Sequence, residues 1–161
     1  MTEILQEVYC DRSSWAEGPW DNEPLDRVEW RHESGLPLLI TRNGAGGWCG
    51  YVGVPPGHDL YEVDYSEVRG LEVHGGLTYS AKCAGHICHV AQPGEPDEVW
   101  WLGFDHGHMS DLLPGSPYPS YGSGGTYRDQ EYARAGVESL SEQIVAKSYH
   151  IQEVEDEDFF D

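Results

Sequence analysis

Two histidines and two aspartates lie within the stretch GFDHGHMSD, residues 103–111, directly after the apolar run VWWL. Asp105 and His108 offer one carboxylate and one imidazole, which are ligand types that zinc, iron and manganese take in proteins. Asp111 would serve as a fourth ligand or as the general base that deprotonates a bound water. The spacing predicts a metal site in a loop, although a polar turn rich in histidine has the same composition.

A third ligand has to come from another segment, and His74 is the candidate. It ends the apolar stretch LEV and precedes Gly75-Gly76, whose missing side chains would leave its imidazole approachable. His74, Asp105 and His108 would then form a two-histidine, one-carboxylate face with open positions for water or substrate. The alternative is that these histidines are hydrogen-bonded structural residues, since no spacing such as HExxH supports the metal.

The elements that must position these groups are mostly strands. Alternating or short apolar runs bounded by Gly, Pro and Asn predict a strand in each of six segments. Asn43-Gly44 favours a hairpin turn, and Gly75-Gly76 favours a bulge. The predicted strands are RVEWR (27–31), LPLLIT (36–41), GGWCGYVGV (46–54), LEVHGGLTYSA (71–81), HICHVA (86–91) and EVWWLGF (98–104).

One long helix is predicted over residues 126–148, because apolar residues recur there at helical spacing. Thr126 and Asp129 approximate a capping box at its start. The fold class is therefore α+β: a mainly antiparallel sheet, one long C-terminal helix packed on one face, and long loops. We expect residues 1–152 to form a single domain and the acidic residues 153–161 to form a tail. The apolar stripe consists of Ala133, Val137, Leu140 and Ile144.

A Gly-rich loop directly before this helix favours an anion. Backbone N–H groups at a helix start attract negative charge, and a guanidinium adds a fork of donors. The spacing matches neither the P-loop nor the dinucleotide fingerprint, so an ordinary flexible loop is the alternative. The residues of this predicted anion site are Gly124, Gly125, Thr126 and Arg128.

The chain contains four cysteines, Cys10, Cys49, Cys83 and Cys88. A chain of this length does not need disulfide bonds to stabilise its fold, so we expect free thiols or metal ligands rather than disulfides. The segment CAGHICH would suit zinc, yet structural zinc sites usually take their ligands from two short motifs that are separated in the sequence. On a strand, His86 and Cys88 would share one face and His89 the other, so the four side chains could not converge. Two half-buried cysteines on a strand are the favoured interpretation.

Charge restricts the classes of partner. Nine basic residues face 29 acidic ones, which gives a net charge of −20 in 161 residues. Such a surface repels phosphate, so we expect no direct nucleic-acid binding and no membrane binding. A basic host protein remains an open partner, and a role in solubility alone is the alternative. No apolar run approaches the roughly 20 residues of a membrane span. The N-terminal residues lack the features of a signal peptide, which predicts a cytoplasmic location.

Four stretches, WCGYVGVPPGH, VHGGLTYS, VWWLGFDHGH and YRDQEYARAGVESLSEQ, together resemble a group of small bacteriophage and bacterial proteins of no known activity. The resemblance runs from about Trp48 to Gln143. It implies a phage or prophage accessory protein, in the host-cell cytoplasm if a phage encodes it. Within the group's pattern, Asp105 and His108 match, whereas His106 need not be histidine.

These features together predict a small metal-dependent enzyme, a hydrolase of phage or prophage type. His74, Asp105 and His108 would hold a divalent ion, zinc or manganese, and Asp111 would be the catalytic base. One alternative is an acidic, non-enzymatic inhibitor that covers a basic host protein. Another is a protein that sequesters a small ligand with the Gly-rich loop and aromatic walls.

Overall fold

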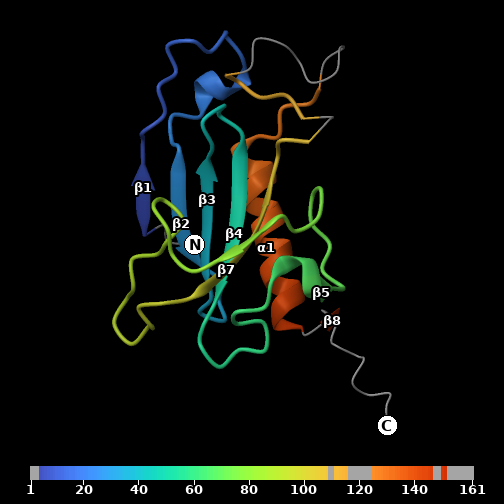
Figure 1. Ribbon diagram of the computed structural model, residues 1–161. Coiled ribbons are helices and arrows are strands. Elements are labelled where there is room, and N and C mark those ends of the chain that lie inside the picture. The colour runs from blue at the N-terminus through green and yellow to red at the C-terminus, as the bar shows by residue number, and fades with distance from the viewer. Residues whose placement is uncertain (1–3, 109–110, 116–124, 147–149, 152–161) are drawn as a thin grey trace.

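The structure is a computed structural model that describes residues 4–108, 111–115, 125–146 and 150–151. Six strands form one antiparallel sheet in the order β1-β2-β3-β4-β7-β6, and two short strands, β5 and β8, pair separately (Figure 1). The strands are β1 Leu5–Glu7, β2 Arg27–Arg31, β3 Pro37–Arg42, β4 Trp48–Val54, β5 Val68–Arg69, β6 Tyr79–Ala81, β7 Trp100–Asp105 and β8 His150–Ile151. The helices are α1 Gln130–Val145 and two short 3-10 helices, η1 Pro19–Asn22 and η2 Tyr65–Glu67. The predicted α+β class is confirmed.

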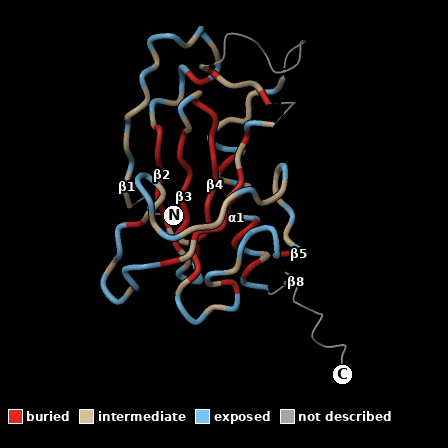
Figure 2. The backbone as a smooth tube through the Cα atoms, viewed as in Figure 1, coloured by how far each residue is buried: buried red, intermediate tan, exposed pale blue. Residues whose placement is uncertain are grey.

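The centre of the sheet is buried on both faces, as the continuous red of β3 and β4 shows in Figure 2. One face packs against α1 in a cluster that includes Trp30, Leu102 and Phe104. The opposite face forms a second cluster that includes Tyr51 and Trp101. Strands buried on both faces read as continuous apolar runs, which explains the composition of LPLLIT and VWWL.

Close packing of α1 on the sheet depends on Gly50 in β4. A Cβ at this position would lie 2.6 Å from Phe104 Cζ and 2.6 Å from Val137 Cγ2. The alternation of glycine with large residues in β4 therefore marks a strand closely approached on one face.

Helix α1 begins later than the sequence predicts. Its N-cap is Asp129, whose side chain accepts a hydrogen bond from the Tyr132 N–H, so the capping box that we expected from Thr126 is wrong. Thr126 instead bridges to Asp111 in extended conformation. The apolar stripe is confirmed, because all four of its members are buried against the sheet (Ala133, Val137, Leu140 and Ile144). Within the described residues, no helix is long and apolar enough to cross a membrane.

Two of the predicted strands are wrong in large part. In the segment 71–81 only β6 is a strand, and Gly75 and Gly76 form a turn with φ values of +71° and +81° rather than a bulge. The segment 86–91 contains no strand. Its first residues belong to a tight hairpin in which Ala84 pairs with Ile87, and a disulfide joins the flanking Cys83 and Cys88. The expectation of free thiols at these two positions is therefore wrong, while Cys10 and Cys49 are free.

The turn at Asn43-Gly44 also differs from the two-residue hairpin that the dipeptide favours. The loop closes between Asn43 N and Gly47 O at 2.8 Å, and Gly46, with φ of +90°, takes the left-handed conformation. The Asn43 side chain accepts hydrogen bonds from the N–H groups of Ala45 and Gly47. Asn43 thus shapes the loop with its amide oxygen rather than with a positive φ.

Candidate active site at His74 and Asp111

Four segments bring polar groups together at one end of β7. The strand ends at Asp105, and His106 continues its pairing with β4 by donating its N–H to the Trp48 carbonyl at 3.0 Å. The loop before β6 contributes His74, and the start of α1 contributes Tyr132. Asp111 belongs to a short segment that bridges to Thr126. A rigid sheet edge and a helix end therefore position groups that lie on loops.

Asp111 is a fully buried carboxylate whose hydrogen-bonded partners include His74, His108 and Arg128. Its oxygens lie 2.9 and 3.0 Å from His74 Nε2, and they accept hydrogen bonds from the His108 N–H at 2.9 Å and from Arg128 Nε at 3.0 Å. Burial by itself raises the pKa of this carboxyl, but these hydrogen bonds outweigh burial and hold the pKa below its ordinary value. Asp111 is therefore ionised at neutral pH.

The ionised Asp111 fixes the tautomer of His74. A carboxylate can only accept, so Nε2 of the neutral imidazole must carry the proton that it donates. Nδ1 then keeps its lone pair and accepts a hydrogen bond from the Tyr132 hydroxyl at 3.1 Å. The His74 side chain is 14% exposed, so Nδ1 is the basic atom of a mostly buried pair.

His106 lies beside this pair and is neutral. Its side chain is 1% exposed, and its ring packs edge-on against His74 at 4.8 Å between ring centroids. Burial, reinforced by the charge of His74, lowers its pKa from 6.5 to about 4. Neither ring nitrogen has a hydrogen-bond partner among the described residues. A buried imidazole without hydrogen-bond partners is costly.

A cavity of about 380 Å³ opens beside the two histidines, between the loop before β6, the end of β7 and one side of α1. The exposed Tyr132 ring stands over His74 and His106, with centroids 5.6 and 5.2 Å away. The volume suits a small molecule rather than a polymer segment. The lining residues are Glu72, Val73, His74, Phe104, His106, Tyr132, Ala135, Gly136 and Ser139.

Gly75 and Asp105 hold His108 apart from this cavity. A Cβ on Gly75 would lie 2.1 Å from His108 Nε2, so the imidazole rests directly on the glycine backbone. His108 Nε2 is also 3.5 Å from Asp105 Oδ1, while the other Asp105 oxygen accepts a hydrogen bond from Thr78 at 3.0 Å. Gly75 therefore makes room for His108 rather than for His74.

The predicted metal ligands lie near one another but in two separate pairs. His74 is paired with Asp111, and His108 is paired with Asp105, while the rings of the two histidines are 5.7 Å apart. Among the described residues, three donor atoms come within 4.8 Å of one another in two other groups: Cys83, Cys88 and His89, and His32, Glu33 and Glu142. In this arrangement Asp111 orients a histidine, whereas the sequence suggested a catalytic base or a fourth ligand.

Two residues of the site were not among the predicted ligands. His106 was set aside in favour of its neighbours, yet it directly follows a buried strand, which is a signal for a buried side chain. Tyr132 lies at the start of α1, where its position relative to the loop before β6 depends on the tertiary fold.

One donor of the predicted anion site and one backbone donor beside it are already occupied. Arg128 Nε donates to Asp111, and the N–H of Gln130 donates to Glu23 Oε2 at 2.9 Å. With Asp129 as the N-cap, two carboxylates sit at the start of α1 and disfavour another anion there. Gly124 lies outside the described residues, while Gly125 and Thr126 lead into this helix start.

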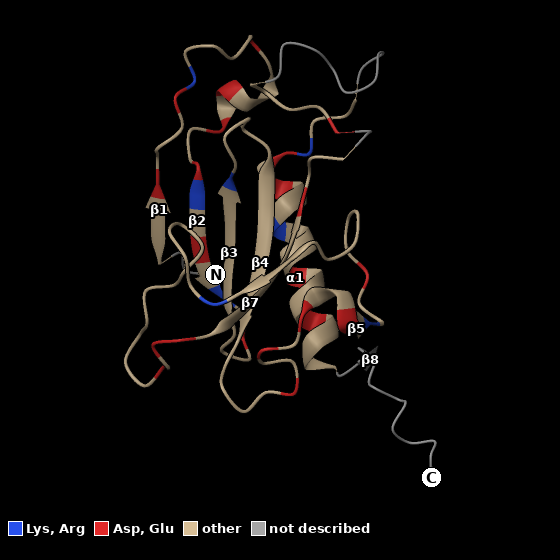
Figure 3. Cartoon of the chain, viewed as in Figure 1, with Lys and Arg blue, Asp and Glu red and all other residues tan. Residues whose placement is uncertain are grey.

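Acidic residues surround the site on many elements. Figure 3 shows them on loops at both ends of the sheet and along α1. With a net charge of −20, the field near the cavity disfavours anionic ligands.

Comparison of the chain with protein families, with characterised proteins and with solved structures finds no match. The chemistry of the site is therefore inferred from its geometry alone.

Proposed function

We propose that this protein is a small hydrolase in which His74 is the general base and Asp111 is the residue that orients it. The observation that carries the proposal is the chain of contacts from the buried Asp111 through His74 to the cavity. A buried carboxylate that holds one nitrogen of an imidazole leaves the other nitrogen poised to take a proton.

The catalytic step follows from the tautomer. A water that replaces the Tyr132 hydroxyl at His74 Nδ1 would give up a proton to that nitrogen while its oxygen attacks the carbonyl carbon of an ester or amide. The bond from that carbon to the leaving oxygen or nitrogen then breaks, and the imidazolium returns the proton to the leaving group. The ionised Asp111 would stabilise the imidazolium that forms. Tyr132 is 42% exposed, so its ring can move aside when a substrate enters.

His106 supplies a neutral donor at the wall of the cavity. With a pKa of about 4, its ring carries one N–H at neutral pH and no net charge. Both ring nitrogens are buried in this structure, so the ring would have to turn toward the cavity before this donor could stabilise an oxyanion that develops during attack. This use would satisfy a ring nitrogen that has no partner among the described residues.

The substrate class follows from volume and charge. A cavity of about 380 Å³ takes a small molecule, and Glu72 in its lining adds to the negative field. An uncharged or cationic ester or amide is therefore favoured over a nucleotide or another polyanion.

The proposal is tested with a panel of uncharged and cationic p-nitrophenyl esters. We expect turnover by the wild-type protein above the buffer rate, and a loss of about 100-fold or more in His74→Gln. His86→Gln is the matched control, because His86 is an exposed histidine that stacks on Tyr9 and does not line the cavity. Equal rates in the wild type and His74→Gln would refute the proposal.

A second candidate function, a metal-dependent hydrolase with zinc or manganese, is favoured by the unpartnered nitrogens. His106 has both ring nitrogens and His108 has Nε2 without a hydrogen-bond partner among the described residues. Asp111, hydrogen-bonded to His74, resembles the carboxylate that commonly orients a metal-bound histidine. Activity that disappears with a chelator and returns with Zn²⁺ or Mn²⁺ would support this candidate over the metal-free reaction.

A further inference from the structure

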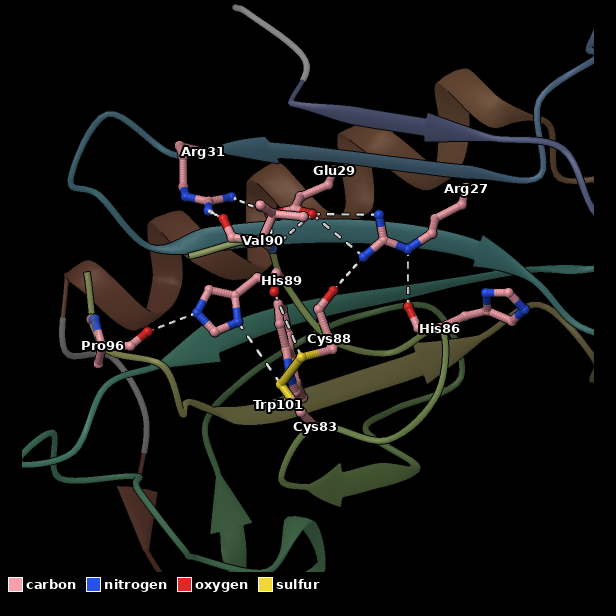
Figure 4. Close-up of a disulfide and its surroundings, with 10 residues drawn as sticks. All are labelled: Arg27, Glu29, Arg31, Cys83, His86, Cys88, His89, Val90, Pro96 and Trp101. Atoms are coloured by element: carbon pink, nitrogen blue, oxygen red, sulfur yellow. Dashed lines mark hydrogen bonds and ion pairs between the residues drawn. A yellow bond between two sulfur atoms is a disulfide. The ribbon is translucent and has the colours of Figure 1, made fainter. Parts of the chain in front are cut away.

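The hairpin that carries the disulfide holds its two cysteines side by side independently of the bond. Ala84 and Ile87 exchange two backbone hydrogen bonds of 2.9 Å, and Cys83 and Cys88 are the next pair outward, with Cα atoms 4.5 Å apart (Figure 4). A Cα separation near 4.5 Å is typical of a cross-strand pair whose side chains face each other. Both thiols would therefore remain neighbours after reduction.

His89 faces the same sulfur atoms with a free lone pair. Its Nε2 donates to the Pro96 carbonyl at 2.9 Å, so the lone pair of the neutral ring is on Nδ1, which lies 3.8 Å from Cys83 Sγ. A ring N–H that is held by a backbone carbonyl is the usual arrangement of a metal-bound histidine. His89 is buried, whereas both cysteines are half-exposed and accessible to a reductant.

A further donor acts on the sulfur itself. The indole N–H of Trp101 points at Cys83 Sγ at 3.4 Å, and the Trp101 ring packs on His89 with centroids 5.9 Å apart. An N–H directed at sulfur favours the thiolate, which is the form that binds metal.

The surrounding loop is held by β2 rather than by the disulfide alone. Arg27 donates to the carbonyls of His86 and Cys88, and Glu29 accepts from the Val90 N–H at 3.0 Å (Figure 4). Glu29 is fully buried and Arg27 nearly so, which makes these contacts strong restraints on the loop backbone. The ligand geometry is therefore largely set before any ion arrives.

We propose that reduction of this disulfide creates a zinc site made of Cys83, Cys88 and His89. A dithiol reductant would supply two electrons and two protons, become a disulfide itself and leave two thiols on this chain. Zn²⁺ then displaces the two thiol protons and binds both thiolates and His89 Nδ1, with water in the fourth position. Oxidation by a disulfide or a peroxide removes two electrons from the thiolates, re-forms the bond and releases the ion.

The distances agree with this ligand set. Zinc bonds of about 2.3 Å to sulfur and about 2.0–2.1 Å to nitrogen place tetrahedral N and S ligands roughly 3.6 Å apart, and Nδ1 and Cys83 Sγ are separated by 3.8 Å. Reduction then has only to let the two sulfurs move apart to about the same separation. The expectation that these side chains could not converge assumed a strand; without one, Cys83, Cys88 and His89 lie together, while His86 stacks on Tyr9 with centroids 4.0 Å apart.

The test compares the intact chain in its reduced and oxidised forms. We expect the reduced protein to bind one Co²⁺ with thiolate charge-transfer absorption, and Zn²⁺ to displace it at one equivalent. The oxidised protein should show no such absorption, and this comparison needs no substitution that could disturb folding. Absence of the thiolate band in the reduced protein, or an equal band in both forms, would overturn the proposal.

Substitutions then identify the ligands. Cys83→Ser and His89→Ala each remove a ligand, so they should weaken Zn²⁺ binding by more than the roughly 10- to 100-fold that loss of an outer-shell partner costs. Cys49→Ser and His86→Ala should not weaken it, and circular dichroism checks that each variant is folded. His106→Phe should leave the thiolate band unchanged, because His106 packs with His74 and Tyr132 rather than in the cluster that includes Cys83. Unchanged Zn²⁺ binding in Cys83→Ser and His89→Ala would contradict the assignment even if the protein proves to be an esterase.

Discussion

Asp111 and His74 are 37 positions apart in the sequence, and both carboxylate oxygens of Asp111 lie within 3.0 Å of His74 Nε2. Asp111 is fully buried and ionised, so its charge is balanced by the N–H groups around it. Its contacts restrict the imidazole to one tautomer and direct the basic nitrogen toward Tyr132 and the cavity.

Asp111→Asn should reduce the esterase rate by about 100- to 10,000-fold, because an amide no longer stabilises an imidazolium and no longer selects the tautomer. It should also lower the free energy of unfolding by about 1–3 kcal/mol, since the partners of Asp111 lose a charged acceptor. Asp105→Asn is the control: this carboxylate is half-exposed and 3.5 Å from His108, and its loss should leave the rate unchanged. Steady-state kinetics and urea unfolding measure both effects, and equal rates in the two variants would count against the orienting role.

Gly75 and Gly76 provide a matched pair for the packing of His108. Both have positive φ, so alanine at either costs about 1–2 kcal/mol in backbone strain. At Gly76 a Cβ meets nothing within 4 Å among the described residues, whereas at Gly75 it would lie 2.1 Å from His108 Nε2. Urea unfolding should therefore show Gly75→Ala to be the more destabilising by at least about 1 kcal/mol. Adding His108→Ala should remove that difference, and equal losses in the two single variants would show that His108 does not rest on Gly75.

His106 should make the free energy of unfolding depend on pH at values above the pH range in which carboxylates titrate. Its pKa in the folded state is about 4 and its ordinary value is 6.5, so the unfolded state takes up the proton first as pH falls. Its contribution to stability is complete above pH 6.5 and is lost between 6.5 and about 4, by roughly 3 kcal/mol in total. The contribution of Asp111, whose pKa is lowered, is lost only as pH falls below its ordinary value of 3.8.

The measurement is the free energy of unfolding from pH 7 to pH 4 for the wild type and His106→Phe. Phenylalanine keeps an aromatic ring among Phe104, His74 and Tyr132 but does not titrate. The wild type should lose stability relative to the variant across this range. Parallel curves would show that His106 is not a buried neutral imidazole.

Val137 and Val145 test the contact between α1 and the sheet. Val137 is fully buried against β4, whereas Val145, at the end of the helix, is 43% exposed. Val137→Asp should lower stability by about 3–5 kcal/mol or prevent folding, because it buries an unpaired carboxylate. Val145→Asp should change the melting temperature little. Similar melting temperatures in the two variants would mean that the stripe is not a core face.

The sequence predicts the sheet and the helix well where periodicity and burial act together. β2 alternates Val28 and Trp30 with charged residues, β3 and β7 are apolar runs, and the stripe of α1 has one period throughout. The segments 71–81 and 86–91 mislead because their apolar residues pack against the sheet from loops. In those loops, glycines with positive φ at 75, 76 and 85 turn the chain away from strand pairing.

The membership of the candidate site could be predicted only in part, because the sequence did not indicate His106 or Tyr132. His74, Asp105, His108 and Asp111 do gather in one region, since all flank β7 or the loop beside it. Which imidazole pairs with which carboxylate depends on contacts across the fold, such as Arg128 with Asp111 and His108 with Gly75. The disulfide likewise depends on a hairpin whose closure rests on two residues, Ala84 and Ile87.

The tautomer of His74 is the most direct test of the central claim, and it requires no substrate. Nitrogen-15 NMR of the ring at a pH where His74 is neutral distinguishes a protonated Nε2 from a protonated Nδ1. We expect the proton on Nε2 in the wild type, and a mixture of tautomers in Asp111→Asn, where the amide can donate as well as accept. A proton on Nδ1 in the wild type would contradict the account, because the lone pair would then face Asp111 and no base would face the cavity.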